Sequence, residues 1–216
     1  MLKGKTAIIT GCSRGIGEAT LNVFAQNGAN VLAHARKRTD EFEHKCEELE
    51  HTYGVMVKPV YFEATDSLQM KQAVKEIQGD TKGKVDILVN NMGTVNSVKL
   101  FQMTKMEEIR EEFDVNFFAQ IEFTQYISRL MVINISSCAG LDGNTGMLQY
   151  VSSKAALIGA TKRLAIELGN YNIRVNSIAP GLTETDMGNQ MNEELEQQLL
   201  DHLIIKRKAK REEIAN

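Results

Sequence analysis

Features that mark several other classes of protein are scarce or missing in this chain of 216 residues. It has three cysteines, an odd number without a Cys-x-x-Cys pair, which indicates a reducing cytosol rather than a disulfide-stabilised secreted protein. No apolar segment approaches the roughly 20 residues that cross a bilayer, and residues 1–10 lack the pattern of a signal peptide. We therefore expect a cytoplasmic protein without a membrane partner.

Charge and linker composition exclude further classes. The net charge of −3 and the pI near 5.9 give no reason to expect nucleic acid or an anionic membrane surface as a partner. The chain has only two prolines and no serine-rich, repetitive or low-complexity tract that could serve as a linker. Its length suits one hydrophobic core, so we expect residues 1–216 to form a single domain.

Short apolar runs alternate with longer helical patterns along the whole chain. This alternation predicts an α/β protein with a doubly wound parallel sheet and helices on both faces. The expected strands are 6–10, 30–34, 57–62, 85–90, 131–136 and 174–178, and the expected helices are 15–27, 40–53, 67–79, 104–127 and 150–170. Ligands bind such sheets beyond the carboxyl ends of the strands. Residues that follow strands there include Gly11, Asn90, Ser137 and Pro180.

The first strand leads into a glycine-rich turn, Gly-Cys-Ser-Arg-Gly-Ile-Gly at residues 11–17, and then into a mostly apolar helical segment. This is the context of a dinucleotide-binding loop, because glycines permit close backbone approach and a helix N-terminus offers N–H groups to a pyrophosphate. The spacing is GxxxGxG rather than the commoner GxGxxG. A glycine-rich turn without a ligand is the alternative interpretation.

Tyr150 and Lys154 follow the serine pair Ser136 and Ser137 at a distance that suits a strand followed by a helix. Residues four apart share a helix face, where the ammonium would lower the pKa of the phenol towards the range of efficient proton transfer. A serine at the strand end could hold a substrate oxygen beside the phenol. Alone, the spacing more often means a half-buried ring and a solvated lysine.

Six ordered motifs together resemble the short-chain dehydrogenase/reductase family over the whole of residues 1–216. They are TGCSRGIG at 10–17, NNMG at 90–93, DVN at 114–116, NISS at 134–137, YVSSK at 150–154 and RVNSIAPG at 174–181, the last followed by TETDM. Within the family the chain looks most like bacterial 3-oxoacyl-[acyl-carrier-protein] reductases, through SRGIG, APGLTETDM and the final EEIAN. The resemblance implies a Rossmann-type sheet.

The resemblance also implies a ketoreductase that moves a hydride from NADPH to a carbonyl, free or bound to an acyl carrier. Tyr150 would donate the proton and Ser137 would hold the carbonyl oxygen. Lys154 would lower the Tyr150 pKa and bind the nicotinamide ribose, and Asn116 would anchor a water that links this lysine to solvent. No metal is implied. The implied cofactor contacts are Gly11, Ser13, Arg14, Gly15, Ile16, Gly17, Arg36, Glu63, Ala64, Asn90, Met92, Gly93, Tyr150, Lys154, Pro180, Gly181 and Thr183.

The end of the second expected strand favours NADP(H) over NAD(H). An NAD-selective site places an acidic residue about twenty residues beyond the glycine loop, on the ribose 2′-hydroxyl. Here the strand runs into Arg36-Lys37-Arg38, and no carboxylate occurs before Asp40. Arg14 can approach the same phosphate from the glycine loop, and guanidinium groups bind phosphate through paired hydrogen bonds. Ordinary surface arginines are the alternative.

Several alternatives and departures remain. The substrate could be a sugar, a steroid-like ketone or a small alcohol or aldehyde, and a non-catalytic nucleotide-binding scaffold is a rival of another class. The segment 184–200 repeats apolar residues at helical spacing and could be core or a substrate lid. The interval between Asn116 and Ser137 is shorter than usual in the family, whose members also continue beyond Asn216. We expect residues to be missing from the sequence at both places.

The resemblance further implies a homotetramer. The helical segments 104–127 and 150–170 carry more apolar side chains than one core absorbs, and symmetric self-association is the common way to bury such a surplus. A thick core within a monomer is the alternative.

Overall fold

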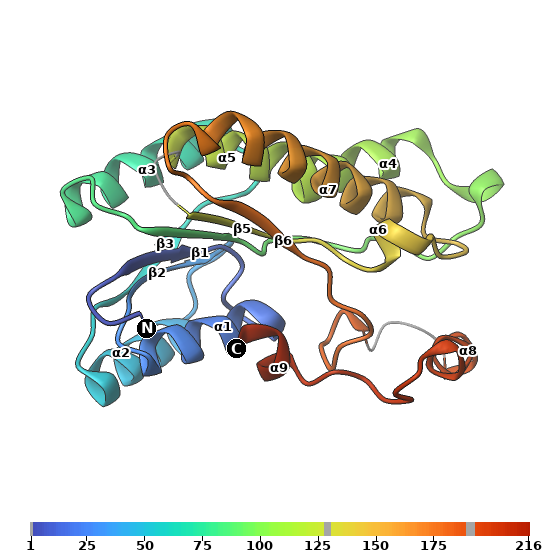
Figure 1. Ribbon diagram of the computed structural model, residues 1–216, viewed down its shortest axis with the longest axis horizontal. Coiled ribbons are helices and arrows are strands. Elements are labelled where there is room, and N and C mark those ends of the chain that lie inside the picture. Colours follow the sequence, from blue (N-terminus) through green and yellow to red (C-terminus); the bar gives the residue numbers. More distant parts are fainter. Residues whose placement is uncertain (1, 128–130, 189–192) are drawn as a thin grey trace.

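The computed structural model describes residues 2–127, 131–188 and 193–216. Within these ranges six parallel strands form one sheet in the order β3-β2-β1-β4-β5-β6 (Figure 1). The strands are β1 (Thr6–Ile9), β2 (Asn30–Ala35), β3 (Val57–Tyr61), β4 (Ile87–Asn90), β5 (Met131–Ile135) and β6 (Val175–Ile178). This confirms the predicted doubly wound Rossmann-type sheet. The largest difference in a strand end is at β4, which begins two residues later than expected.

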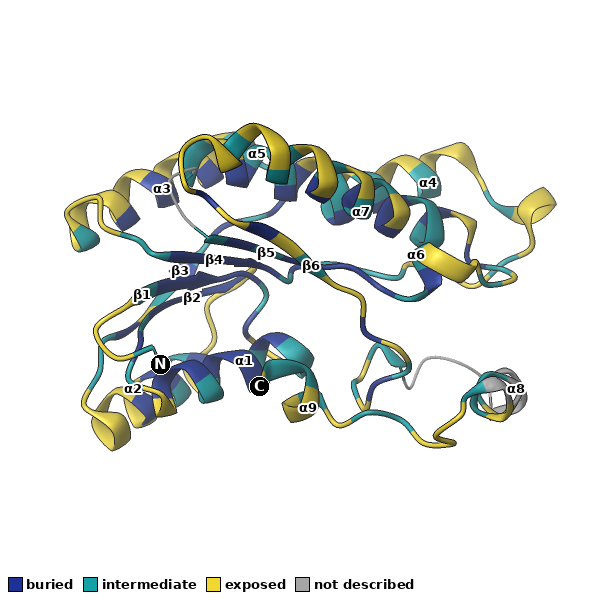
Figure 2. Ribbon diagram, in the orientation of Figure 1, coloured by how far each residue is buried: buried dark blue, intermediate teal, exposed yellow. Residues whose placement is uncertain are grey.

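Helices cover both faces of the sheet (Figure 1). One face carries α1 (Gly15–Gln26) and α2 (Asp40–Tyr53), and the other carries α3 (Ser67–Thr81), α5 (Ala119–Ile127) and α7 (Leu148–Gly169). Successive strand residues point to opposite faces: Ile9 packs in the cluster that includes Leu21 of α1, while Ile8 packs with Phe123 of α5. The central strands β1, β2 and β4 are therefore buried between two apolar layers, while the edge strands β3 and β6 and the outer helix faces have exposed residues (Figure 2).

The segment 104–127, expected to be a helix, contains three consecutive helical parts between Met106 and Ile127. A 3-10 turn, η1 (Phe101–Met103), precedes α4 (Met106–Phe113), and a π-helical turn, η2 (Asp114–Phe118), separates α4 from α5. A π-turn widens the helix by one residue and occurs mostly at functional sites. Here it carries Asn116, whose side chain is turned inwards and hydrogen-bonds to Thr94. The expected helical stretch is therefore present from Met106 to Ile127, and the π-turn with its inward hydrogen bonds is the feature that the sequence did not predict.

The remaining helices lie towards the end of the chain. They are α6 (Ala139–Asp142), α8 (Glu193–His202) and α9 (Arg211–Ala215). The last of these packs against α1, where Arg211 forms an ion pair with Glu18 at 2.7 Å, so the final residues lie beside the glycine loop (Figure 1). A backbone bridge between Thr183 and Ala209 holds the same segment against the chain that follows β6.

Two of the sequence-based expectations concern segments that the structure describes only in part. The short interval before Ser137 is spanned by α5, which ends at Ile127, and by β5, which begins at Met131. In the apolar stripe of segment 184–200, Met191 lies outside the described residues, while Met187 and Leu199 line the cavity discussed below. None of the described helices has the length and apolarity that a membrane span requires.

Candidate active site

The carboxyl ends of the strands open into one cavity of about 2210 Å³. Predicted site residues from all six strand ends line it: Gly11, Ser13, Arg14, Gly15, Ile16, Arg36, Glu63, Ala64, Met92, Gly93, Ser137, Tyr150, Lys154, Pro180, Gly181 and Thr183. Three other predicted residues, Gly17, Asn90 and Asn116, are not among the described residues that line this cavity.

The glycine loop has the shape that a dinucleotide requires. Gly11 and Gly15 have φ of +73° and +62°, the left-handed region that favours glycine. A Cβ on Gly11 would lie 3.1 Å from the Cα of Met92, so a side chain would fill the space between loop and strand end. Helix α1 starts after Arg14 without a side-chain cap on its described N-terminus, which leaves N–H groups for an anion. The backbone therefore fits a pyrophosphate.

Gly17 has a packing role instead of the predicted cofactor contact. A Cβ at this position would lie 2.1 Å from the carbonyl oxygen of Gly11 and 2.4 Å from Nδ2 of Asn91. Only a glycine lets α1 approach the loop this closely. Asn91, which the motif analysis missed, holds the arrangement: its Nδ2 donates to the carbonyl oxygens of Thr10 and Gly11 at 2.9 and 3.0 Å. Its place beside Asn90 in the NNMG motif was the available signal.

Asn90, predicted to contact the cofactor, is instead part of the sheet's interior. Its Nδ2 donates to Thr124 Oγ1 and to Asn134 Oδ1, both at 2.8 Å, and Asn134 Nδ2 donates to Thr161 Oγ1. These bonds join β4 and β5 to α5 and α7. The Asn90 side chain therefore points into the sheet, while Met92 and Gly93, further along, line the cavity, and a contact between Asn90 and the cofactor stays a prediction.

His34 is a second residue that the motif analysis missed. It is buried at the end of β2, where its Nδ1 accepts from the backbone N–H of Gly11 at 3.1 Å. Since Nδ1 accepts, Nε2 carries the proton and donates to the carbonyl oxygen of Phe62 at 3.0 Å. Burial lowers the pKa of His34 to about 4, so the ring is neutral at pH 7. The imidazole thus fixes the glycine loop against β3.

Arg14 and Arg36 lie at the glycine-loop end of the cavity, as the NADP(H) prediction requires. Each is largely exposed and has a distant carboxylate: Arg14 lies 3.7 Å from Asp186, and Arg36 lies 3.9 Å from Glu63. Such exposed, long ion pairs contribute little, so both guanidinium groups can turn to an added phosphate. Glu63 is directed at Arg36.

Ser137, Tyr150 and Lys154 meet at the other end of the cavity. Ser137 follows β5, and its hydroxyl hydrogen-bonds to the phenol of Tyr150 on α7. Lys154, one turn further along α7, lies with Nζ 5.9 Å from the centroid of the tyrosine ring and donates to the carbonyl oxygen of Ile135 at 2.8 Å. The ammonium is buried, and burial lowers the pKa of Lys154 to about 8.

The expected lowering of the Tyr150 pKa by Lys154 is not found. Burial raises the pKa of Tyr150, the hydrogen bond to Ser137 opposes this, and the negative charge of Glu112 adds to the rise. Lys154 is not among the groups that shift this pKa, although its Nζ lies 5.9 Å from the ring centroid. In this state the phenol keeps its proton at neutral pH.

Asn116 does not line the cavity, but its side chain makes three hydrogen bonds to residues beside the site. Its Oδ1 accepts from the N–H of Thr94 at 2.8 Å, and its Nδ2 donates to the carbonyl oxygen of Thr94 at 2.9 Å and to Ser153 Oγ at 3.2 Å. A Cβ on Gly93 would lie 3.2 Å from Asn116 Oδ1 and 3.4 Å from Lys154 Nζ. The structure therefore brings Asn116 and Lys154 together around Gly93.

Comparison with known proteins identifies the family. The family model described as short chain dehydrogenase matches residues 5–196. This chain belongs to the short-chain dehydrogenase family. It is 36% identical over 221 residues to the 3-oxoacyl-[acyl-carrier-protein] reductase FabG of Thermotoga maritima, with 99% of this chain and 88% of that protein covered.

Solved structures of other short-chain dehydrogenases have the same fold. A short-chain dehydrogenase from Burkholderia cenocepacia in complex with NADP has a TM-score of 0.90 and 31% identity, covering 99% of this chain and 88% of that one. A 7α-hydroxysteroid dehydrogenase complexed with NADH and 7-oxo glycochenodeoxycholic acid has a TM-score of 0.91 and 32% identity, covering 99% and 85%. In the described residues of this short-chain dehydrogenase, no group of three or more His, Cys, Asp or Glu could hold a metal.

Proposed function

We propose that this short-chain dehydrogenase is an NADPH-dependent carbonyl reductase whose substrate is a 3-oxoacyl thioester. The observation that carries the proposal is the meeting of Ser137, Tyr150 and Lys154 in the cavity that also contains the glycine loop. A hydroxyl, a protonated phenol and a buried ammonium are the groups that a carbonyl needs as it becomes an alcohol.

The chain's residues have separate tasks in this reaction. When bound, the cofactor supplies the hydride. Ser137 holds and polarises the carbonyl oxygen, and Tyr150 donates its proton to that oxygen. The raised pKa of Tyr150 suits an acid, because the phenol is fully protonated before the reaction. Lys154 binds the nicotinamide ribose through its ammonium, while Asn116 orders the segment next to it.

Cofactor choice follows from the arginines at the other end. We assign Arg14 and Arg36 to the 2′-phosphate of NADP(H), since both face the cavity and neither is committed to a close ion pair. The NADP complex of the Burkholderia relative supports this choice. The NADH complex of the 7α-hydroxysteroid dehydrogenase shows that the same fold accepts either cofactor, so NADH belongs in every assay.

The substrate class is supported by likeness and by the cavity wall. The Thermotoga maritima relative is named for 3-oxoacyl-[acyl-carrier-protein] reduction. The cavity that contains Tyr150 also has apolar lining residues, which suit an acyl chain or a steroid: Val98, Leu100, Met147, Leu199 and Leu203. A steroid-like ketone is the second candidate, because the steroid complex has the same fold at a TM-score of 0.91.

We further propose a cytoplasmic homotetramer. The outer faces of η2 and α7 leave large apolar side chains in solvent, among them Phe118 at 56% exposure and Ile166 at 67%. Exposed apolar side chains of this size favour symmetric association, which would bury them. Sedimentation at micromolar concentration should therefore show an oligomer, and a 24.1 kDa species alone would contradict the proposal.

The proposed reaction is tested by following NADPH consumption with a 3-oxoacyl thioester, a steroid ketone and a small aldehyde. We expect the thioester to give the highest kcat/KM with NADPH, and a lower value with NADH. Cofactor binding is measured separately by fluorescence. Binding without turnover of any carbonyl would favour the nucleotide-binding scaffold and overturn the proposal.

A further inference from the structure

Glu112 is a fully buried carboxyl group that none of the motifs includes. It lies on α4, one helical turn before Asn116, and its Oε2 accepts from the backbone N–H of Asn96 at 3.2 Å. Its Oε1 is buried too and has no hydrogen-bond partner among the described residues. A buried acid is rarely tolerated unless its charge serves a purpose or is balanced nearby. The partner must come from an element that packs against α4.

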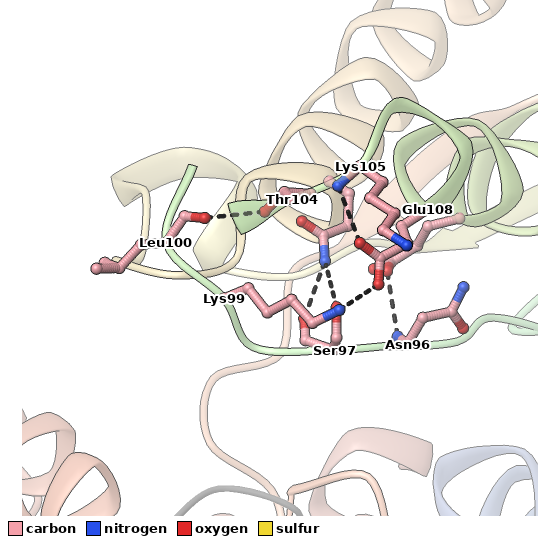
Figure 3. Close-up of polar contacts among 9 residues, drawn as sticks. Asn96, Ser97, Lys99, Leu100, Thr104, Lys105 and Glu108 are labelled. Carbon is pink, nitrogen blue, oxygen red and sulfur yellow. Dashed lines mark hydrogen bonds and ion pairs between the residues drawn. The ribbon is translucent and has the colours of Figure 1, made fainter. Parts of the chain in front are cut away.

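The surroundings on α4 and its adjoining loop offer no such partner. Lys99 is bound to Glu108, which also accepts from the backbone N–H of Lys105 (Figure 3). Glu111 and Asp114 are exposed carboxylates that line the cavity, and they add negative charge rather than a cation. Asn96 approaches only through its backbone amide (Figure 3). The positive charge that balances the Glu112 carboxylate must therefore come from another element.

The partner is on α7, which packs against α4. Among the described residues, Lys154 is the cation whose charge acts on Glu112, lowering its pKa, and Glu112 in turn raises the pKa of Lys154. The same carboxylate raises the pKa of Tyr150. The geometry supports the same link, because Asn116, one helical turn beyond Glu112, lies beside Lys154 around Gly93.

We propose that Glu112 is a positioning residue of the reduction, whose buried negative charge keeps Lys154 as an ammonium and Tyr150 as a phenol. The inference rests on the proposed carbonyl reductase function. A nearby negative charge favours a cation and disfavours a phenolate, so both effects keep the proton where the reaction needs it. Burial raises the pKa of Glu112 itself to about 7, so the charge is present above neutral pH, where the two protons are most easily lost.

The first test is the pH profile of kcat/KM for the E112Q enzyme. Glutamine can keep the hydrogen bond to Asn96 but has no charge, so the alkaline limb should move to lower pH by about one unit, a tenfold loss of kcat/KM on that limb. At pH 6 the two enzymes should differ by less than about threefold, because Glu112 is then mostly protonated in the wild type. A purely structural role would lower the whole profile without moving its limb, and that result would overturn the proposal.

Two further variants control this test. E107Q changes the same residue type on the same helix at an exposed position and should leave the profile unchanged. E112D keeps the charge and should restore the alkaline limb to the wild-type pH. If E112Q does not fold, the pH profile of E112D is the test. An alkaline limb that lies about one pH unit below that of the wild type, although the charge is retained, would contradict the proposal.

The second test does not depend on turnover. In the folded protein Glu112 holds its proton up to about pH 7, against 4.5 in the unfolded chain. Wild-type stability should therefore fall relative to that of E112Q as pH rises from 5 to 8, measured by thermal unfolding without cofactor. In a K154M background the fall should move to higher pH, since the opposing charge is gone.

The two proposals fail separately. If the wild type reduces no carbonyl, the proposed function is wrong, while the unfolding curves still decide whether Glu112 and Lys154 are coupled. If turnover is found but wild type and E112Q unfold in parallel over this pH range, the role of Glu112 is wrong.

Discussion

The two halves of the sheet differ in what they bury. The half built from β1, β2, β3, α1 and α2 buries three polar side chains among its described residues, Thr10, Thr20 and His34. The half built from β4, β5, α4, η2, α5 and α7 buries many more: Asn90, Glu112, Asn116, Gln120, Thr124, Asn134, Gln149, Ser153, Lys154 and Thr161. In the first half, backbone groups face the ligand and the interior behind them is mostly apolar. In the second half, ionisable side chains lie in a buried polar network.

The contrast shows how one fold separates binding from chemistry. A pyrophosphate can be held by backbone N–H groups, which need close approach and no side chain. Proton transfer needs side chains with displaced pKa values, which arise where ionisable groups are buried near one another. Substitutions in the first half should therefore act on binding and stability, and those in the second on rate and its pH dependence.

The largest effect expected in the first half is that of Gly17→Ala. The added methyl group would meet the carbonyl of Gly11 at 2.1 Å, so the loop and α1 must separate. We expect unfolding free energy to fall by about 3 kcal/mol, the upper end for overpacking, and NADPH binding to be lost. Denaturant unfolding and fluorescence titration measure the two effects.

Gly79→Ala is the matched control, because a Cβ there meets nothing within 4 Å on the exposed side of α3. It should leave binding unchanged and stabilise the protein by up to about 1 kcal/mol. If Gly17→Ala bound NADPH with wild-type affinity, the glycine loop would not be part of the cofactor site.

The double variant Arg14→Ala/Arg36→Ala sharpens the contrast within the cofactor site. Charge-assisted hydrogen bonds are worth about 1.5–3 kcal/mol each, so the loss of both should lower the ratio of kcat/KM for NADPH to that for NADH by about a hundredfold or more. Arg163→Ala, an exposed position on α7, is the control. Equal or NADH-favouring values in the wild type, or an unchanged ratio in the double variant, would contradict the assignment.

A comparable effect on stability should be seen only at acid pH, where the two halves should respond in opposite directions. The folded-state pKa of His34 is about 4, below its ordinary 6.5, so its stabilisation is full above pH 6.5 and is lost as pH falls towards 4. The loss amounts to about 3 kcal/mol. Glu112 has a raised pKa, so its contribution is instead lost as pH rises.

His34→Gln cannot take up a charge and should flatten the acid slope, as measured by urea unfolding between pH 4 and 7. His51→Gln, at an exposed histidine on α2, should keep the wild-type slope. An unchanged slope in His34→Gln would mean that the loop is not anchored by a neutral imidazole.

The sequence predicted the first half better than the second. Apolar runs located every strand, because buried parallel strands read as continuous hydrophobic segments. The glycine loop was found because its constraint is local: strand, turn and helix are adjacent in the chain. Arg14 and Arg36 were placed for the same reason.

In the second half the sequence located residues but not their directions. The side chain of Asn90 points into the sheet, and the pKa of Tyr150 is raised, because both depend on neighbours far away in the chain. The π-turn at Asn116 depends on bonds to Thr94 in the same way. Glu112 was missed because it stands in an acidic stretch with Glu111 and Asp114, and only the packing of α4 on α7 distinguishes it from them.

The account rests on Tyr150 as the proton donor, and one variant tests it most directly. Tyr150→Phe removes the hydroxyl and keeps the ring, so the fold and the cofactor end of the cavity are untouched. We expect kcat for carbonyl reduction to fall by ~10²–10⁴-fold, as for a lost general acid, while NADPH binding measured by fluorescence stays at the wild-type value. A Tyr150→Phe enzyme that reduces its substrate at a near-normal rate would contradict the account.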